Sequence, residues 1–143
     1  MQPPSWPGPR RSIEALASRL GRAAVVAACI DLLAGRDVED EVVLALGGPP
    51  ARIAMVGGTH VAAYWHRVWA LRGLLWLWDD RATATLVAAM SDESWRAREM
   101  AAKVAARNRV APALEALDAL RRDPVLRVRR AGQRAVETII GAD

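Results

Sequence analysis

Along most of this chain, apolar residues recur at steps of three and four positions, with polar residues between them. That spacing places the apolar side chains on one face of a helix and predicts amphipathic helices rather than strands. In the first third of the chain it predicts helices from about 12 to 20, from 22 to 33 and from 37 to 46. Ser12 and Asp37 stand at the starts of the first and third of these runs and are expected to cap them.

Residues 1–11 precede the first predicted helix and hold four prolines in their first nine positions. We expect this stretch to be a disordered arm, since such a composition neither continues a helix nor builds a core. Trp6 in the arm would serve as a docking anchor or lie on the surface of the chain's own domain. The rest of the chain, residues 12–143, is expected to form one domain that starts with a helical cap over 12–48.

Beyond the cap, the sequence matches itself at a shift of 31 residues. Asp92 falls on Asp123, and two sets of basic residues fall on one another: Arg67 on Arg98 and Arg129, and Arg72 on Lys103 and Arg134. The same alignment predicts three helical hairpins, over about 50–78, 81–109 and 112–140. A hairpin of this length buries its apolar face only by stacking on another. The sequence therefore predicts an all-α solenoid of helical hairpins.

Asp92 and Asp123 are each followed six residues later by an arginine, with Ala or Val just before it and small residues after it. This pattern resembles the HEAT repeat family, most closely its short bacterial HEAT-like members and the PBS-lyase-type repeats. The resemblance covers 81–140 and extends over 50–78, and it implies a right-handed solenoid whose second helices line a concave surface. Val61 stands where the first repeat would have its aspartate. The resemblance also implies a ladder in which the arginine of one repeat meets the aspartate of a neighbour, formed here by Arg67, Asp92, Arg98, Asp123 and Arg129.

The predicted second helix of the first hairpin carries a row of tryptophans. Trp65, Trp69 and Trp76 are four and seven residues apart and share one helix face, with Arg72 between them. The resemblance to HEAT repeats implies that this row and its matching positions line one groove. Trp and Arg are the residues that dominate protein-binding hot spots. Alternatively, the row packs against the cap helices and the basic positions form a solvated face. The matching positions of the next two hairpins are mostly basic: Arg96, Met100, Lys103 and Arg107, then Arg127, Ala131, Arg134 and Thr138.

Charge is distributed unevenly along the chain, which carries a net charge of +4. Residues 95–134 hold eleven bases and four acids, whereas residues 31–41 hold five acids and one base. The basic stretch suits an acidic protein partner or the phosphates of a nucleic acid, and the two stretches together would let copies associate head to tail. No uncharged apolar run reaches the roughly 20 residues of a membrane span. Cys29, the single cysteine, lies in an apolar run and forms no internal disulfide, so we expect a core residue in a cytoplasmic protein.

The sequence contains no constellation of residues that points to catalysis, a cofactor or a metal. His60 and His66 are six residues apart and do not share a helix face. Asp79 and Asp80 follow Trp78, a combination that resembles the base-holding site of HEAT-like DNA glycosylases, but either carboxylate would also cap the next helix. The PBS-lyase resemblance offers a tetrapyrrole lyase as a further alternative.

The leading hypothesis is therefore a non-catalytic interaction or scaffold module that binds a protein partner through the Trp- and Arg-lined groove. The alternative is a nucleic-acid-binding protein, either architectural or a reduced HEAT-like DNA-repair protein, that uses the basic part of the groove. The predicted binding residues are Trp65, Trp69, Arg72, Trp76, Arg96, Lys103, Arg107, Arg127 and Arg134.

Overall fold

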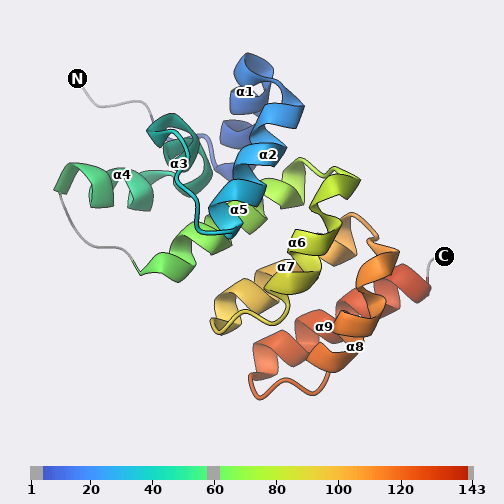
Figure 1. Ribbon diagram of the computed structural model, residues 1–143. Coiled ribbons are helices and arrows are strands. Elements are labelled where there is room, and N and C mark those ends of the chain that lie inside the picture. The colour runs from blue at the N-terminus through green and yellow to red at the C-terminus, as the bar shows by residue number, and fades with distance from the viewer. Residues whose placement is uncertain (1–4, 58–61, 142–143) are drawn as a thin grey trace. The chain divides into compact units, whose positions relative to one another are not determined.

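The computed structural model describes residues 5–57 and 62–141, and within these ranges every regular element is a helix (Figure 1). The protein is thus all-α, as the spacing of its apolar residues predicts. Contacts divide the chain into two compact units, the first ending at Leu77 and the second beginning at Trp78. None of the described helices is long and apolar enough to cross a membrane. Three features named above lie outside the described residues: the start of the arm at 1–4, His60 and Val61.

The first unit contains five helices among its described residues. In chain order they are α1 (Pro9–Leu20), α2 (Arg22–Leu33), α3 (Asp40–Gly47), α4 (Pro49–Gly57) and α5 (Ala63–Trp76). Helix α5 is central, since α1, α2 and α3 all pack against it, and α4 packs on α3 (Figure 1). The largest fully buried side chains of this unit come from these helices: Ile13, Leu16, Val25, Val26, Cys29, Leu46, Leu71 and Leu74.

A glycine in α5 allows its close approach to α2. A Cβ on Gly73 would lie 2.6 Å from the Cys29 sulfur and 2.8 Å from the Leu46 side chain, closer than packed atoms approach one another. Burial raises the pKa of Cys29 to about 12, so its thiol stays protonated at neutral pH. Cys29 is therefore a core residue, as its place in an apolar run predicts.

Two predicted caps of the first unit are wrong. Helix α1 begins at Pro9, within the stretch expected to be an arm, because the fixed φ of proline suits the first helical position. Ser12 then lies inside the helix, and its hydroxyl donates a hydrogen bond of 2.8 Å to the Ala45 carbonyl of α3. Helix α3 begins at Asp40, so Asp37 precedes it by three residues and is not its N-cap.

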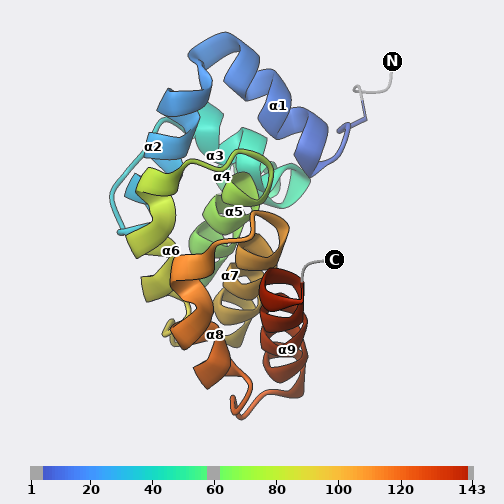
Figure 2. The same ribbon diagram turned by 90° about the vertical axis from the view of Figure 1, so that its right-hand side faces the viewer.

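The second unit contains four α-helices among its described residues, and a short 3₁₀ turn precedes two of them. They are α6 (Thr83–Ala89) after the turn Asp80–Ala82, α7 (Trp95–Arg107), α8 (Leu114–Leu120) after the turn Ala111–Ala113, and α9 (Leu126–Ile140). Helices α7 and α9 lie side by side, while α6 packs on α7 and α8 packs on α9 (Figures 1 and 2). The unit thus consists of two helical hairpins, and the side chains of Leu86, Val104, Leu117 and Val128 are fully buried in it.

Proline is tolerated in the first turn of a helix, so Pro112 and Pro124 are each expected to begin a helix of the second unit. Pro112 lies within the 3₁₀ turn that leads into α8, where its missing N–H is tolerated. The sequence also predicts Pro124 in the first turn of the last helix. Instead α9 begins at Leu126, and Pro124 belongs to the preceding turn, in which the Val125 N–H donates a hydrogen bond of 2.9 Å to the Asp123 carboxylate.

An ion pair joins the two hairpins of the second unit at their turns. Arg98 on α7 donates two hydrogen bonds to the Asp123 carboxylate, of 2.7 Å from Nε and 3.2 Å from Nη2. Arg98 also donates a bond of 2.8 Å to the carbonyl of Asp92, six residues before it. Arg129, 31 residues later, donates an equivalent bond of 2.8 Å to the carbonyl of Asp123. Each arginine thus holds the turn before its own helix, and Arg98 reaches the next turn as well.

The Asp123 carboxylate is stabilised in its charged form although the residue is only 8% exposed. Burial by itself would raise the pKa of Asp123. The hydrogen bonds from Arg98 and from the Val125 N–H, together with the charges of Arg98 and Arg129, outweigh burial and lower this pKa below its usual value. The carboxylate therefore stays ionised and paired at neutral pH.

Candidate binding sites

The tryptophan row of α5 faces other helices of the first unit. Trp69 is 5% exposed, and a Cβ on Gly47 of α3 would lie 2.8 Å from its ring. Arg72 donates a hydrogen bond through Nη2 to a backbone carbonyl of α3. The guanidinium carbon of Arg10 on α1 lies 5.0 Å from the centre of the Trp76 ring. The row therefore packs largely against α1 and α3, which is the alternative that the sequence leaves open.

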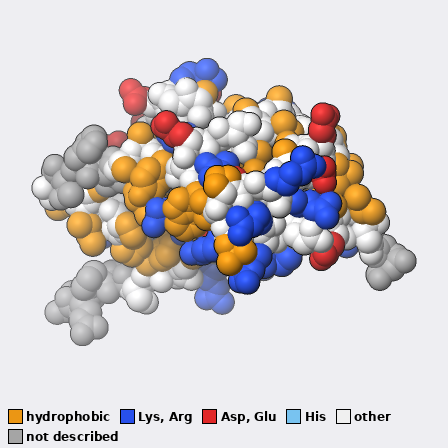
Figure 3. All heavy atoms as spheres, turned by 90° about the horizontal axis from the view of Figure 1, so that it is seen from below, with side chains coloured by type: hydrophobic (Ala, Val, Ile, Leu, Met, Phe, Trp, Pro, Cys, Tyr) orange, Lys and Arg blue, Asp and Glu red, His pale blue; other side chains and the backbone are white. Residues whose placement is uncertain are grey.

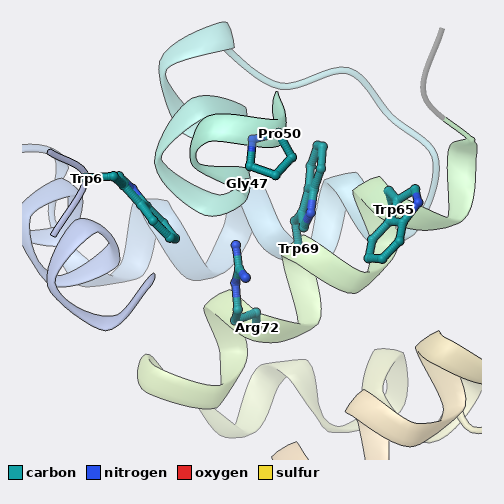
Figure 4. Close-up of a pocket in the computed structure, with 6 residues that line it drawn as sticks. All are labelled: Trp6, Gly47, Pro50, Trp65, Trp69 and Arg72. Carbon is teal, nitrogen blue, oxygen red and sulfur yellow. The ribbon is translucent and has the colours of Figure 1, made fainter. Parts of the chain in front are cut away.

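A pocket of about 350 Å³ lies where the row meets α3 and α4. Figure 4 shows the Arg72 side chain between the rings of Trp6 and Trp69, with Pro50 nearby and Trp65 beyond Trp69. The volume lies in the range of pockets that enclose small molecules. Three indoles, a proline ring, a glycine and a guanidinium line the pocket: Trp6, Trp65, Trp69, Pro50, Gly47 and Arg72.

Two glycines let the indoles close around the pocket. Gly48 has a φ of +66°, a left-handed conformation, and a Cβ there would lie 2.7 Å from the Trp6 ring. A Cβ on Gly47 would come similarly close to Trp69. The same two glycines end α3, with Gly48 as its C-cap. Trp6 lies on the surface of its own unit, one of the two places expected for it.

Arg72 brings a partly buried positive charge to the pocket. Its described contacts are the Leu46 carbonyl, which accepts from Nη2, and the Trp6 ring, whose centre is 5.7 Å from Cζ. Burial lowers the pKa of Arg72, since the charged guanidinium is disfavoured away from water. The Nε of Arg72 and the Nε1 of Trp6 are buried N–H donors without an acceptor among the described residues. The pocket thus combines flat apolar walls with the positive charge of Arg72.

A second candidate site lies on α7 and α9, and we call it the basic face: Trp95, Arg96, Lys103, Arg107, Arg127 and Arg134. The guanidinium carbon of Arg96 lies 4.4 Å from the centre of the Trp95 ring, and that of Arg127, on the neighbouring helix, lies 5.2 Å from it. Both distances are within the range of cation–π attraction. Trp95 is therefore held by two arginines that come from two helices.

Glu99 on α7 links the two helices of the basic face and is 8% exposed. Its carboxylate accepts a hydrogen bond of 2.9 Å from Arg127 Nε, and Lys103 Nζ lies 3.9 Å from its other oxygen. The side chains of Arg127 and Lys103 nevertheless stay 64% and 43% exposed. Glu99 thus orients two cations while leaving much of each in contact with solvent.

Lys103, Arg107 and Arg134 continue the basic face along the helices, and all three are exposed. Lys103 follows Arg96 by seven residues, and Arg134 follows Arg127 by the same interval, so each pair lies on one side of its helix. Figure 3 shows Lys and Arg side chains gathered over this part of the surface. The predicted basic positions of α7 and α9 therefore form one surface within the second unit.

The predicted binding residues thus fall into two sets in different units. Trp65, Trp69 and Arg72 line the pocket of the first unit, and Trp76 lies beside Arg10 in the same unit. The predicted bases of α7 and α9 belong to the basic face. A continuous groove that joins the two sets stays a prediction, and so does the ladder role of Arg67 on α5.

Sequence reasoning missed Trp95 and Glu99. Trp95 falls outside the tryptophan row because its position matches Tyr64 and Leu126 at the 31-residue spacing. The signal that would have found it is local: Trp95 directly precedes Arg96 and stands one helical turn before Glu99.

The carboxylates of Asp79 and Asp80 both serve local structure. The Asp79 side chain accepts a hydrogen bond of 2.9 Å from the Arg81 N–H and is the N-cap of the 3₁₀ turn before α6. Trp78 Nε1 donates a hydrogen bond of 3.0 Å to Asp80. The expectation that one of these carboxylates caps the helix that begins near Arg81 is confirmed for the 3₁₀ turn, whereas α6 itself has no side-chain cap.

Comparisons of the chain with protein-family models, with curated proteins and with solved structures find no match. The resemblance to HEAT repeats therefore rests on this chain's own residues. The strongest of these are Arg98 and Arg129, which make equivalent backbone bonds at a spacing of 31 residues.

Proposed function

We propose that the protein is a non-catalytic interaction module and that its basic face binds an acidic segment of a protein partner. The observation that carries this proposal is the position of Trp95 beside both Arg96 and Arg127 on neighbouring helices. Tryptophan and arginine contribute more than other residues to binding hot spots. Because contacts within the protein already orient these side chains, less side-chain freedom is lost when a partner binds.

The charge of the two helices favours an acidic partner. Together α7 and α9 contain eight Lys and Arg residues and two Glu residues. Arg98 and Arg129 hold the turns, and Glu99 offsets part of the charge of Arg127 and Lys103. The other bases of the face leave it positive, and a positive surface attracts acidic segments and speeds their association.

We also infer that the hairpins form a right-handed α-solenoid of HEAT-like repeats, with the second helix of each hairpin on the concave side. The equivalent bonds of Arg98 and Arg129 support this inference, as does the pair between Arg98 and Asp123. An ion pair at a turn contributes more to the register of stacked hairpins than to net stability.

A second candidate function, nucleic-acid binding, is favoured by the arrangement of the bases. Arg96, Lys103 and Arg107 follow one side of α7, and Arg127 and Arg134 follow one side of α9. Two rows of cations would hold phosphates, and the indole between them would stack on a base.

Titrations with two labelled probes distinguish these functions. One probe is a peptide of about 15 residues that repeats Glu-Leu-Asp, and the other is a DNA duplex of about 20 base pairs, long enough for several phosphate contacts. Fluorescence anisotropy at low and near-physiological salt should show peptide binding that weakens modestly and duplex binding that is lost. Tight duplex binding that falls steeply with the logarithm of salt would instead favour the nucleic-acid function. If neither probe binds at low salt, both functions are wrong.

A charge-reversal variant tests the site itself. Changing Arg96, Lys103 and Arg134 together to Glu should abolish binding of the acidic peptide, because the cations of the face become anions. Helical melting followed by circular dichroism should change little, since side chains at the surface contribute little to stability. Unaltered peptide binding by this variant would contradict the proposal.

A control variant carries the same change of net charge on exposed residues of the first unit: Arg11, Arg36 and Arg52, each changed to Glu. We expect this control to bind the acidic peptide with an affinity close to that of the wild type. Equal loss of binding in both variants would show that net charge, and not the basic face, attracts the peptide.

A further inference from the structure

Two side chains that line the pocket of the first unit carry buried N–H groups whose hydrogen-bonding capacity is unused. Arg72 donates through Nη2 to the Leu46 carbonyl, but its Nε has no acceptor among the described residues, and neither has Trp6 Nε1. A buried donor without an acceptor is costly, and native proteins keep few of them. Each of these two atoms has less than 1 Å² of exposed surface, but the half-buried Arg72 side chain can turn its donors toward a molecule in the pocket.

The charge of Arg72 determines which kind of acceptor fits. Its described contacts are a carbonyl and an indole ring, neither of which neutralises the guanidinium. Burial also lowers the pKa of Arg72, because it removes water from the charged guanidinium. A cationic ligand would add a second positive charge to this site, whereas an anionic oxygen would accept a charge-assisted hydrogen bond.

The walls of the pocket determine the rest of the ligand. Trp69 packs against Gly47 and Trp6 against Gly48, in both cases without room for a Cβ, so the two rings are fixed in place. Fixed aromatic faces favour a flat apolar group that stacks on them. A volume of about 350 Å³ suits a single small molecule.

We propose that this pocket is a binding site for a small aromatic carboxylate. The ring of the ligand packs among Trp6, Trp65 and Trp69, and its carboxylate accepts a hydrogen bond from the Arg72 guanidinium. The site lies wholly in the first unit and does not depend on the partner binding proposed for the basic face. Failure of one proposal therefore leaves the other untouched.

Three probes that share one ring separate the effect of charge from that of shape. They are 2-naphthylacetate, the neutral 2-(2-naphthyl)ethanol and the cationic 2-(2-naphthyl)ethylamine. We expect the carboxylate to bind at least about tenfold more tightly than the alcohol, because only the carboxylate forms a charge-assisted bond, and the amine to bind most weakly. An alcohol that binds as tightly as the carboxylate, or an amine that binds more tightly, would overturn the proposal.

The tryptophans report where the probe binds. In ¹H–¹⁵N spectra of the indole N–H groups, naphthylacetate should shift the signals of Trp6, Trp65 and Trp69, because their rings line the pocket. The signal of Trp95, which belongs to the basic face, should stay in place. Unshifted pocket signals at about 5 mM naphthylacetate, a concentration that detects even weak binding, would also overturn the proposal.

Variants of the full chain assign the effect to Arg72. Arg72→Met should lower the affinity for naphthylacetate to that for the alcohol and leave the affinity for the alcohol unchanged. Trp6→Phe keeps an aromatic wall and the charge of Arg72, so it should lower the preference for the carboxylate less. Arg10→Met is the matched control, since Arg10 also lies over an indole of this unit but does not line the pocket. A preference for the carboxylate that survives Arg72→Met would contradict the role of this residue.

Discussion

Matching helix positions are covered in the first unit and open in the second. At the 31-residue spacing, Arg72 of α5 matches Lys103 of α7 and Arg134 of α9, and Trp76 matches Arg107. Arg72 is half-buried and bonded to α3, and Trp76 is half-buried beside α1. Their counterparts Lys103, Arg107 and Arg134 are exposed.

The difference follows from the helices that pack on α5. In the first unit α1 and α3 pack against α5, and the side chains that meet them include indoles, which bury a large apolar surface. In the second unit the matching positions carry cations, which need water or an acidic partner. Ala131, which matches Trp69, is an exception, since it is small and 3% exposed. Residue type at a matching position therefore indicates whether another helix covers it.

The largest effect that tests this comparison is expected at Trp69. Trp69→Ala should lower the free energy of unfolding by about 3–5 kcal/mol, because it leaves a cavity where a buried indole packs on α3. Met100→Ala, at the matching half-buried position of α7, should cost about 1 kcal/mol, since less apolar surface is withdrawn from water there. Urea unfolding followed by circular dichroism measures both. Equal losses of unfolding free energy would mean that other helices cover Trp69 of α5 no better than they cover Met100 of α7.

The next largest effect is expected from the ion pair between Arg98 and Asp123, which joins the two hairpins of the second unit. Arg98→Met should lower the free energy of unfolding by about 2–4 kcal/mol, because it leaves the Asp123 carboxylate buried without its charged partner. Arg129→Met is the matched control, and it should cost about 1 kcal/mol, since Arg129 bonds to the Asp123 and Pro124 carbonyls. If the two substitutions cost the same, the pair between Arg98 and Asp123 contributes no more than the backbone bonds.

The same ion pair predicts a dependence on pH. The pKa of Asp123 is lower in the folded protein than its usual value of about 3.9, so ionised Asp123 stabilises the fold above that pH. This contribution is lost as the pH falls through the folded pKa. The difference in unfolding free energy between the wild type and Asp123→Asn should therefore shrink below about pH 4. A difference that stays constant down to acid unfolding would contradict this role of the carboxylate.

The helices of the second unit could be predicted closely from the sequence, whereas the caps of the first unit could not. The resemblance to HEAT repeats implies that Asp123 lies in a turn and meets Arg98 of the second helix before it, and the two side chains are paired in the structure. Serine is a residue type that favours the N-cap position, but the Ser12 hydroxyl donates a hydrogen bond to the Ala45 carbonyl, 33 residues away. A hydrogen bond between distant segments thus outweighs the local preference of serine for the N-cap position.

The two candidate sites show the same limit of prediction from sequence. The spacing of Trp65, Trp69 and Trp76 identifies residues on one helix face, but it carries no information about what packs on that face. The pocket depends on Trp6 and Gly48, which are distant in sequence and meet because glycine has no Cβ. The arrangement around Trp95 likewise requires α7 and α9 to be neighbours.

The most direct test of the comparison uses thiols placed at matching positions. Cys29 is the chain's single cysteine, and its burial and raised pKa should make it unreactive toward N-ethylmaleimide, so it reports whether the core of the first unit stays closed. Three variants, Trp76→Cys, Arg107→Cys and Thr138→Cys, each add one thiol at one of three matching positions, and mass spectrometry of the cleaved chain follows each site separately.

We expect the thiols introduced at positions 107 and 138 to react about as fast as a small free thiol, because both positions are exposed. The thiol at position 76 should react at least about tenfold more slowly, since this position is half-buried beside α1. Equal rates at all three positions, with Cys29 still protected, would contradict the central claim. That claim is that other helices cover this helix face in the first unit, whereas the matching face of the second unit is open to solvent.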